Sequence, residues 1–145
     1  MASVYNNQQC TSRLKSLYDE YTNVFKPLLA EVEATWVELP AAILNEIRSF
    51  NDHISRCYWD NATKESIIDN LNRADSHLKR AELDCFKHLL VYYSDECKNF
   101  EVQTRNIDLT LISDGAFFSE YRKLRRTAVK FTRDAKIAET KNSDE

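Results

Sequence analysis

The sequence predicts an all-α protein: an antiparallel bundle of four main helices, of which the third is long and central. Three observations lead to this fold class. The chain of 145 residues contains one glycine and two prolines, whereas β-sandwiches and barrels need many tight turns rich in these residues and asparagine. Its apolar and charged fractions, 43% and 30%, are typical of a globular chain. Apolar residues recur in steps of three and four along most of its length, which is the period of helices with one buried face.

We expect one domain over residues 1–145, with residues 1–10 and 140–145 frayed. The first two helices are predicted on either side of Pro40. An apolar stripe over residues 14–39 marks the first helix, and Pro27 within it should kink or break the helix. Pro40 suits the first turn of the second helix. The apolar positions of that second helix are Ile43, Ile47, Phe50, Ile54 and Cys57.

The third helix is predicted over residues 63–102, with Thr63 or Asn61 as its cap and Glu65 in its first turn. It would be about 60 Å long at 1.5 Å per residue. Two apolar stripes run along it, and its C-terminal half is therefore apolar on two sides. We expect this half to contact two neighbours or a second subunit. The stripes are Ile67, Leu71, Ala74, Leu78, Ala81, Cys85, His88 and Tyr92, and Phe86, Leu90, Tyr93, Cys97 and Phe100.

The last part of the chain is predicted to be a loop and a coiled-coil-like helix. Residues 107–112 alternate like a strand but have no partner strand, so we expect an extended loop with packed apolar side chains. Residues 113–115 should cap the last helix. Its apolar positions repeat every 3.5 residues over three heptads, which predicts a homodimer or a larger assembly. They are Phe117, Tyr121, Leu124, Ala128, Phe131, Ala135 and Ala138.

Several classes of protein do not fit the sequence. The first ten residues have neither the basic start nor the apolar run of a secretory signal, and no run approaches the roughly 20 apolar residues of a membrane span. The four cysteines show no Cys-x-x-Cys spacing, as expected for free thiols. We therefore expect a cytoplasmic protein without a membrane partner and without a cofactor.

The strongest chemical feature is an Arg-x4-His pair, Arg48 and His53, in a chain with three histidines. On a straight helix the two residues lie about 140° apart, so they converge only if the helix distorts or two copies meet across a dimer axis. In that case His53 can exchange a proton with a ribose 2′-hydroxyl or a leaving oxygen, and Arg48 can hold the phosphate. Asn51 and Asp52 are candidates for orienting the pair, and Asp52 can also pair with Arg48. The alternative is a partly exposed histidine and a solvated arginine without a catalytic role.

An Arg-x4-His pair on a helix of a small all-α bundle resembles the HEPN proteins. Their Arg-x4–6-His motif marks metal-independent ribonucleases that act as dimers, and many are toxins or antiviral defence effectors. Some members have lost catalysis and serve as binding modules. The resemblance covers residues 40–58 and, more loosely, the all-helical layout; the family often has Asn, Asp or His after the arginine, where this chain has Ser49. It implies an RNA-binding or metal-independent RNA-cleaving protein with Arg48 and His53 at its active site.

Two further histidines lie on nearly the same face of the third helix. His77 follows Arg73 by four positions, and His88 lies about 16 Å further along the axis, which is too far for both to bind one metal ion. Asp84 with His88 supplies only two ligands, and no Glu-x-x-His pair of the di-iron type is present. We expect no metal site, and histidines that are satisfied in the core or at an interface.

The last helix has the one marked charge asymmetry. Between Tyr121 and Lys136 there are seven basic residues and one acid, a net charge of +6, so the remainder of the chain carries −9 of the total of −3. Such a surface can bind a phosphate backbone, dock on an acidic protein surface, or simply be solvated. The candidate binding residues are Arg122, Lys123, Arg125, Arg126, Lys130 and Arg133.

Two functions therefore follow from the sequence. The first is a HEPN-like RNA-binding or RNA-cleaving protein, in which His53 is the acid/base, Arg48 holds the phosphate and the basic helix guides the substrate. The alternative is a non-enzymatic helical adaptor that binds another protein in a multi-protein assembly. In the adaptor His53 is dispensable, and charge reversal on the last helix disrupts the assembly.

Overall fold

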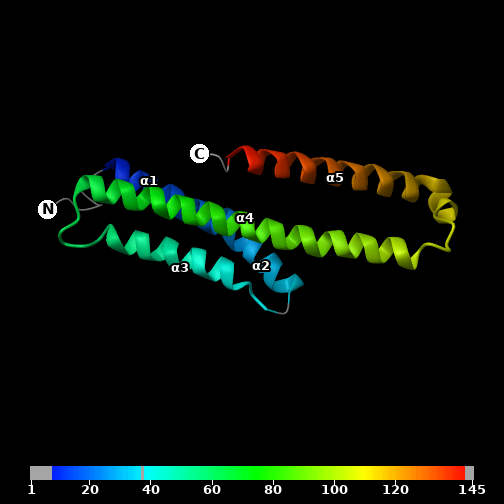
Figure 1. The fold of residues 1–145 in the computed structure, drawn as a ribbon, viewed down its shortest axis with the longest axis horizontal. Helices are drawn as coiled ribbons and strands as arrows, with labels where there is room; N and C mark the ends of the chain where they lie inside the picture. Colours follow the sequence, from blue (N-terminus) through cyan, green and yellow to red (C-terminus); the bar gives the residue numbers. More distant parts are fainter. Residues whose placement is uncertain (1–7, 37, 143–145) are drawn as a thin grey trace. The chain divides into compact units, whose positions relative to one another are not determined.

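The structure is a computed structural model that describes residues 8–36 and 38–142. These residues are all-α, as predicted, and contain no strand (Figure 1). The chain is already helical at Gln8, and Cys10 is buried; the rest of the frayed start that we expected lies outside the described residues. The main helices are the segment 8–35, α3 (Ala41–Arg56), α4 (Lys64–Gln103) and α5 (Ala116–Asn142), and α4 is the long central helix.

The N-terminal helix is continuous but contains a wide turn just before Pro27. In this turn the N–H of Lys26 bonds to the carbonyl of Tyr21, five residues back. Proline lacks an N–H, and its ring crowds the carbonyl four residues earlier, so an extra residue in the preceding turn relieves both conflicts. The predicted distortion is confirmed as a π-helical turn, and the helix continues through it without breaking. Its segments are α1 (Gln8–Glu20), the π-helical turn η2 (Tyr21–Phe25) and α2 (Lys26–Thr35).

The start of α4 is fixed by a reciprocal pair of hydrogen bonds between Thr63 and Ser66. The hydroxyl of Thr63 accepts a bond from the N–H of Ser66 at 3.1 Å, and the hydroxyl of Ser66 accepts one from the N–H of Thr63 at 3.0 Å. This is a capping box in which serine takes the place usually held by glutamate. Thr63 is thus the cap, as predicted, and Glu65 lies in the first turn.

The described chain divides into two compact units, Met1–Glu96 and Cys97–Glu145. The division falls inside α4 and not at a linker. The first unit contains the N-terminal helix, α3 and most of α4. The second contains the end of α4, the 3-10 segment η3 (Leu109–Gly115) and α5.

The first unit is a three-helix bundle. Arg13 of α1 pairs with Asp75 of α4 at 4.0 Å, and further along the same two helices Tyr93 donates a hydrogen bond to Glu31. The N-terminal helix and α4 therefore run in the same direction. The helix between them in sequence, α3, runs antiparallel to both, since Cys57 at its end lies beside Ile67 near the start of α4.

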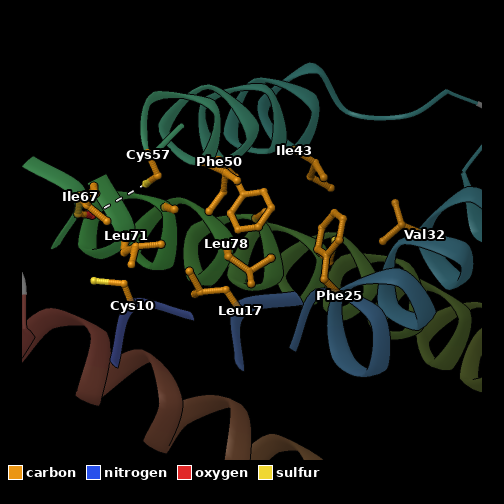
Figure 2. Packing of buried hydrophobic residues seen from close by; sticks show 14 of the residues in the cluster. Cys10, Leu17, Phe25, Val32, Ile43, Phe50, Cys57, Ile67, Leu71 and Leu78 are labelled. Atoms are coloured by element: carbon orange, nitrogen blue, oxygen red, sulfur yellow. Dashed lines mark hydrogen bonds between the residues drawn. The ribbon is translucent and has the colours of Figure 1, made fainter. Parts of the chain in front are cut away.

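Apolar side chains from all three helices fill the core of this bundle. Figure 2 shows Ile43 and Phe50 of α3 pointing toward Leu78 of α4 and Phe25 of the N-terminal helix. The ring of Phe50 stacks on that of Tyr21 with centroids 5.8 Å apart. Both predicted stripes that face this core are confirmed. The buried members are Ile43, Phe50, Ile54 and Cys57 of the α3 stripe, and Ile67, Leu71, Ala74, Leu78, Ala81 and Cys85 of the α4 stripe.

The cysteines are free, and three of them belong to this core. Burial raises the pKa of the Cys57 thiol, and it raises that of Cys85 to about 11. A thiol with a raised pKa stays protonated near neutral pH and is unreactive. These side chains therefore act as small apolar groups, as predicted.

The second unit is a helical hairpin with little core of its own. Phe100 of α4 packs on Phe117 and Tyr121 of α5, with ring centroids 6.2 and 5.1 Å apart. None of the residues 97–140 is buried. Leu124 and Phe131, two apolar positions of the α5 heptads, are 61% and 67% exposed. Earlier on α4, within the first unit, Phe86 and Tyr93 of the second predicted stripe are exposed as well.

The connection between α4 and α5 differs from the extended, packed loop that we expected. Asp108 caps a 3-10 turn by accepting the N–H of Thr110. Leu111 in this turn is 79% exposed, so the apolar side chains do not pack as predicted. Residues 113–115 then turn the chain into α5 with φ angles of 51°, 52° and 82°. No helix in the described ranges is both long and apolar enough to cross a membrane.

Candidate nucleic-acid interface

The α5 helix separates its apolar and basic residues onto different sides. The heptad positions from Phe117 to Ala138, called here the apolar seam, form one stripe along the helix. At 100° per residue, five of the predicted basic residues lie more than about 100° from the centre of that stripe. All five are exposed. These residues, called here the basic face, are Arg122, Lys123, Arg126, Lys130 and Arg133.

Arg125, the sixth predicted basic residue, is not on this face. Its guanidinium lies 3.4 Å from a carboxylate oxygen of Glu101 on α4, and its side chain is largely covered. Tyr121 donates a hydrogen bond of 2.8 Å to the same oxygen. These two donors lower the pKa of Glu101, Tyr121 first, while burial and the carboxylate raise the pKa of Tyr121 to about 12. Arg125 therefore joins the two arms of the hairpin.

The cations of the basic face itself make weaker contacts than Arg125 does. Arg133 contacts the neighbouring Asp134 at 3.3 Å, with both side chains in solvent. Exposed ion pairs of this kind contribute little and exchange readily. The guanidinium of Arg122 lies over the ring of Phe118, 5.5 Å from its centroid. The basic face thus has exposed cations that are available to a polyanion.

Two open hollows lie along the first turns of α5, and they share Phe118, Arg122 and Arg126. The larger, of about 520 Å³, lies on the basic face. The smaller, of about 260 Å³, lies toward the end of α4. Open surfaces with several neighbouring cations suit phosphate groups. The remaining lining residues are Gly115, Ser119, Lys123 and Thr127 in the first, and Glu101, Tyr121 and Arg125 in the second.

The structure of one chain does not bring Arg48 and His53 together. Arg48 is exposed on α3, whereas His53 is 9% exposed and belongs to the interface with α4. Nδ1 of His53 lies 2.9 Å from Oδ1 of Asn70. The amide nitrogen of Asn70 donates to the carbonyl of Ser66, so its oxygen faces the histidine and His53 is the donor of this bond. The non-catalytic alternative expected a partly exposed His53, and this expectation is wrong because the side chain is buried.

The two supporting candidates have local partners. Asn51 donates a hydrogen bond to the carbonyl of Ile47. Asp52 pairs with Arg56, four positions later, and not with Arg48 as we considered. Convergence of Arg48 and His53 at one phosphate therefore still requires a second copy or a rearrangement of α3.

The remaining histidines are held by partners within the first unit. His77 stacks on His53 with ring centroids 5.3 Å apart, and its Nδ1 lies 2.7 Å from a carboxylate oxygen of Glu46. His88 meets Trp36 edge to face. Among the described residues, no three His, Cys, Asp or Glu side chains are grouped so that they could hold a metal ion.

Sequence reasoning did not single out Phe118. It lies outside the heptad positions predicted for the last helix. The signal was present in the spacing, because Phe118 and Arg122 are four positions apart and such pairs share one side of a helix. Comparison with protein-family models, with curated proteins and with solved structures finds no match for this chain.

Proposed function

We propose that this chain is a helical RNA-binding module and that the basic face of α5 is its binding surface. The observation that supports this is the exposed row of five cations set apart from the apolar seam, beside the larger hollow. RNA, rather than another polyanion, is the ligand class that the resemblance to HEPN proteins implies.

Charge distribution favours binding over simple solvation. The whole chain has a net charge of −3, yet five of its 20 Lys and Arg residues lie along one side of one helix. Such a cluster does not help to keep an acidic protein soluble. Binding of a polyanion, in contrast, becomes more favourable with each phosphate that a cation neutralises, because counterions are released. From Arg122 to Arg133 the basic face covers 12 residues, or roughly 17 Å along the helix axis, enough for several phosphates.

The test is titration of a fluorescent RNA with the purified protein, followed by anisotropy at several salt concentrations. We expect log Kd to rise linearly with log salt, with a slope of up to about 3.5 if five phosphates of a single strand are neutralised. Reversal of three charges, Arg122→Glu, Arg126→Glu and Lys130→Glu, should weaken binding about tenfold or more and lower the slope.

The matched control reverses three exposed lysines of the first unit, Lys15, Lys26 and Lys64. It changes the net charge by the same amount, so an equal loss in both triple variants would mean that only total charge matters. Binding to anionic lipid vesicles in place of RNA would overturn the proposal, because a basic helix with an apolar side can also lie on a membrane surface.

RNA cleavage by Arg48 and His53 remains a prediction that the same samples can test. Cleavage of the RNA in excess EDTA by the wild type, lost in His53→Ala with helicity unchanged, would support it. His53 is buried, so the helicity and the thermal midpoint of this variant have to be measured alongside its activity.

The second candidate function is the helical adaptor, and the exposed apolar seam favours it. Leu124 and Phe131 leave most of their surface in solvent, although a heptad repeat of this kind is typical of helices that pack on another helix. A protein that binds no RNA, and whose assembly fails when the basic face is reversed, would be better described by this candidate.

A further inference from the structure

We infer that the RNA bound on the basic face is single-stranded, with a base stacked at Phe118 and Arg122 and the adjoining phosphates held by Lys123 and Arg126. This inference rests on the proposed function and specifies the form of its ligand.

The position of Phe118 supports the inference. It is one of three residues that line both hollows, and therefore lies between them. Arg122 lies over its ring, so a cation already faces this half-buried aromatic ring. The two hollows leave open space on either side of this pair.

Two cations lie next to Phe118 and Arg122, where the phosphates of a bound nucleotide would be. Lys123 and Arg126 line the larger hollow beside Phe118 and Arg122. A base can thus contact the aromatic and guanidinium planes while its phosphates meet these two cations. Stacking platforms flanked by cations are the usual way in which proteins hold single strands without reading their sequence.

A duplex would use this surface poorly. Its bases are stacked on one another, so their faces are hidden and only phosphates, riboses and groove edges remain accessible. The cations of the basic face would still attract it, but Phe118 would have no partner. The structure therefore predicts a preference for single strands, and this preference should disappear when the ring is removed.

The experiment compares a labelled, unstructured single-stranded RNA of about 12 nucleotides with a duplex of the same length, at one ionic strength, by anisotropy. We expect the wild-type protein to bind the single strand more tightly. Phe118→Leu should weaken single-strand binding about 5- to 100-fold, the usual effect of losing one base–aromatic stack, and leave duplex binding within about twofold. Phe118→Tyr, which keeps an aromatic face, should restore most of the affinity for the single strand.

Phe131→Leu is the matched control. It makes the same substitution on the same helix, at an exposed ring on the apolar seam, and should change neither affinity by more than about twofold. Equal affinity of the wild type for both RNAs, or equal effects of the two Phe→Leu variants, would overturn the stacking inference while leaving RNA binding by the cations intact. Absence of binding to either RNA would remove the proposed function and this inference together.

Discussion

At the scale of single residues, Glu82 of α4 has the most unusual environment in the first unit. One of its carboxylate oxygens is buried without a hydrogen-bond partner. Burial, followed by the nearby carboxylates of Glu20 and Asp75, raises its pKa from 4.5 to about 7, against the opposing effect of Lys79. The side chain is half-buried, so solvent screens part of this effect.

This environment predicts a dependence of stability on pH. Between about pH 4.5 and 7 the folded chain keeps a proton on Glu82 that the unfolded chain has lost. Unfolding then releases a proton, so this contribution to the free energy of unfolding declines as pH rises and is absent above pH 7. We expect Glu82→Gln to flatten the decline and to be more stable than the wild type at pH 8, by roughly 1–2 kcal/mol after allowance for screening.

Urea unfolding at pH 5 and pH 8 measures the effect. Glu33→Gln is the control, because Glu33 is exposed on α2 and its substitution should change stability by less than about 0.5 kcal/mol. A free energy of unfolding that changes no more between pH 5 and pH 8 in the wild type than in Glu82→Gln would show that the carboxyl of Glu82 is better solvated than its surroundings indicate.

The sequence showed residue types but not their partners. Arg48 and His53 were recognisable as a motif, yet whether His53 faces solvent depends on Asn70, which is 17 positions away. The raised pKa of Glu82 likewise results from its burial and then from Glu20, which lies on a different helix. Periodicity within one helix contains no information about such neighbours. Predictions of helix faces were therefore more accurate than predictions of individual contacts.

At the scale of elements, the turn into α5 is the most constrained part of the second unit. Ser113, Asp114 and Gly115 all have positive φ, a conformation that glycine adopts freely and other L-residues adopt at a cost of about 1 kcal/mol. A Cβ atom on Gly115 would meet its nearest neighbour, the carbonyl oxygen of Thr110, at 3.7 Å, an ordinary contact distance. Any effect of a side chain there must therefore come from the backbone conformation and not from a clash.

We expect Gly115→Ala to destabilise the start of α5 by about 1 kcal/mol. Ser113→Gly is the paired variant, because it removes a side chain from the same backbone region and should leave stability unchanged or slightly raised. Hydrogen exchange of the amides in the first turns of α5 reports on this local opening directly. Equal protection of these amides from exchange in Gly115→Ala and Ser113→Gly would show that an alanine adopts the positive φ at position 115 at no cost.

Element boundaries were predictable where a local signal defined them. Thr63 caps α4 through bonds to a residue three positions away, and Pro27 distorts the helix that contains it; both effects are local in sequence. The segment 107–112 has an alternating pattern without a partner strand, so its conformation is decided by the cap at Asp108 and the positive-φ turn that follows. The alternation of apolar and polar residues does not predict the cap or the turn.

At the scale of the whole molecule, the buried core is confined to the first unit. Every buried side chain in the described residues lies between Cys10 and Leu89. Burial of apolar surface is the main source of folding stability, so the first unit should remain folded without α5. The apolar seam of α5, by contrast, needs a covering surface to be stable over its length.

Limited digestion with trypsin tests this difference. Cleavage should occur first after Arg105, in the exposed turn beyond α4, and then at the basic residues of α5. The fragment 1–105 should persist and unfold cooperatively, with a thermal midpoint within a few degrees of that of the full chain, because it retains the whole core. Loss of cooperative unfolding in this fragment would mean that α5 contributes to the stability of the first unit.

The concentration dependence of the same digestion tests the predicted self-association. If a second copy covers the seam, α5 should resist cleavage increasingly as protein concentration rises, and light scattering should give a mass above the 17.0 kDa of one chain. Leu124→Glu with Phe131→Glu should abolish that protection, because a charge in a heptad seam is costly to bury. The basic face lies on the other side of α5, so this double variant should still bind RNA; loss of both properties would show that the two sides of the helix depend on each other.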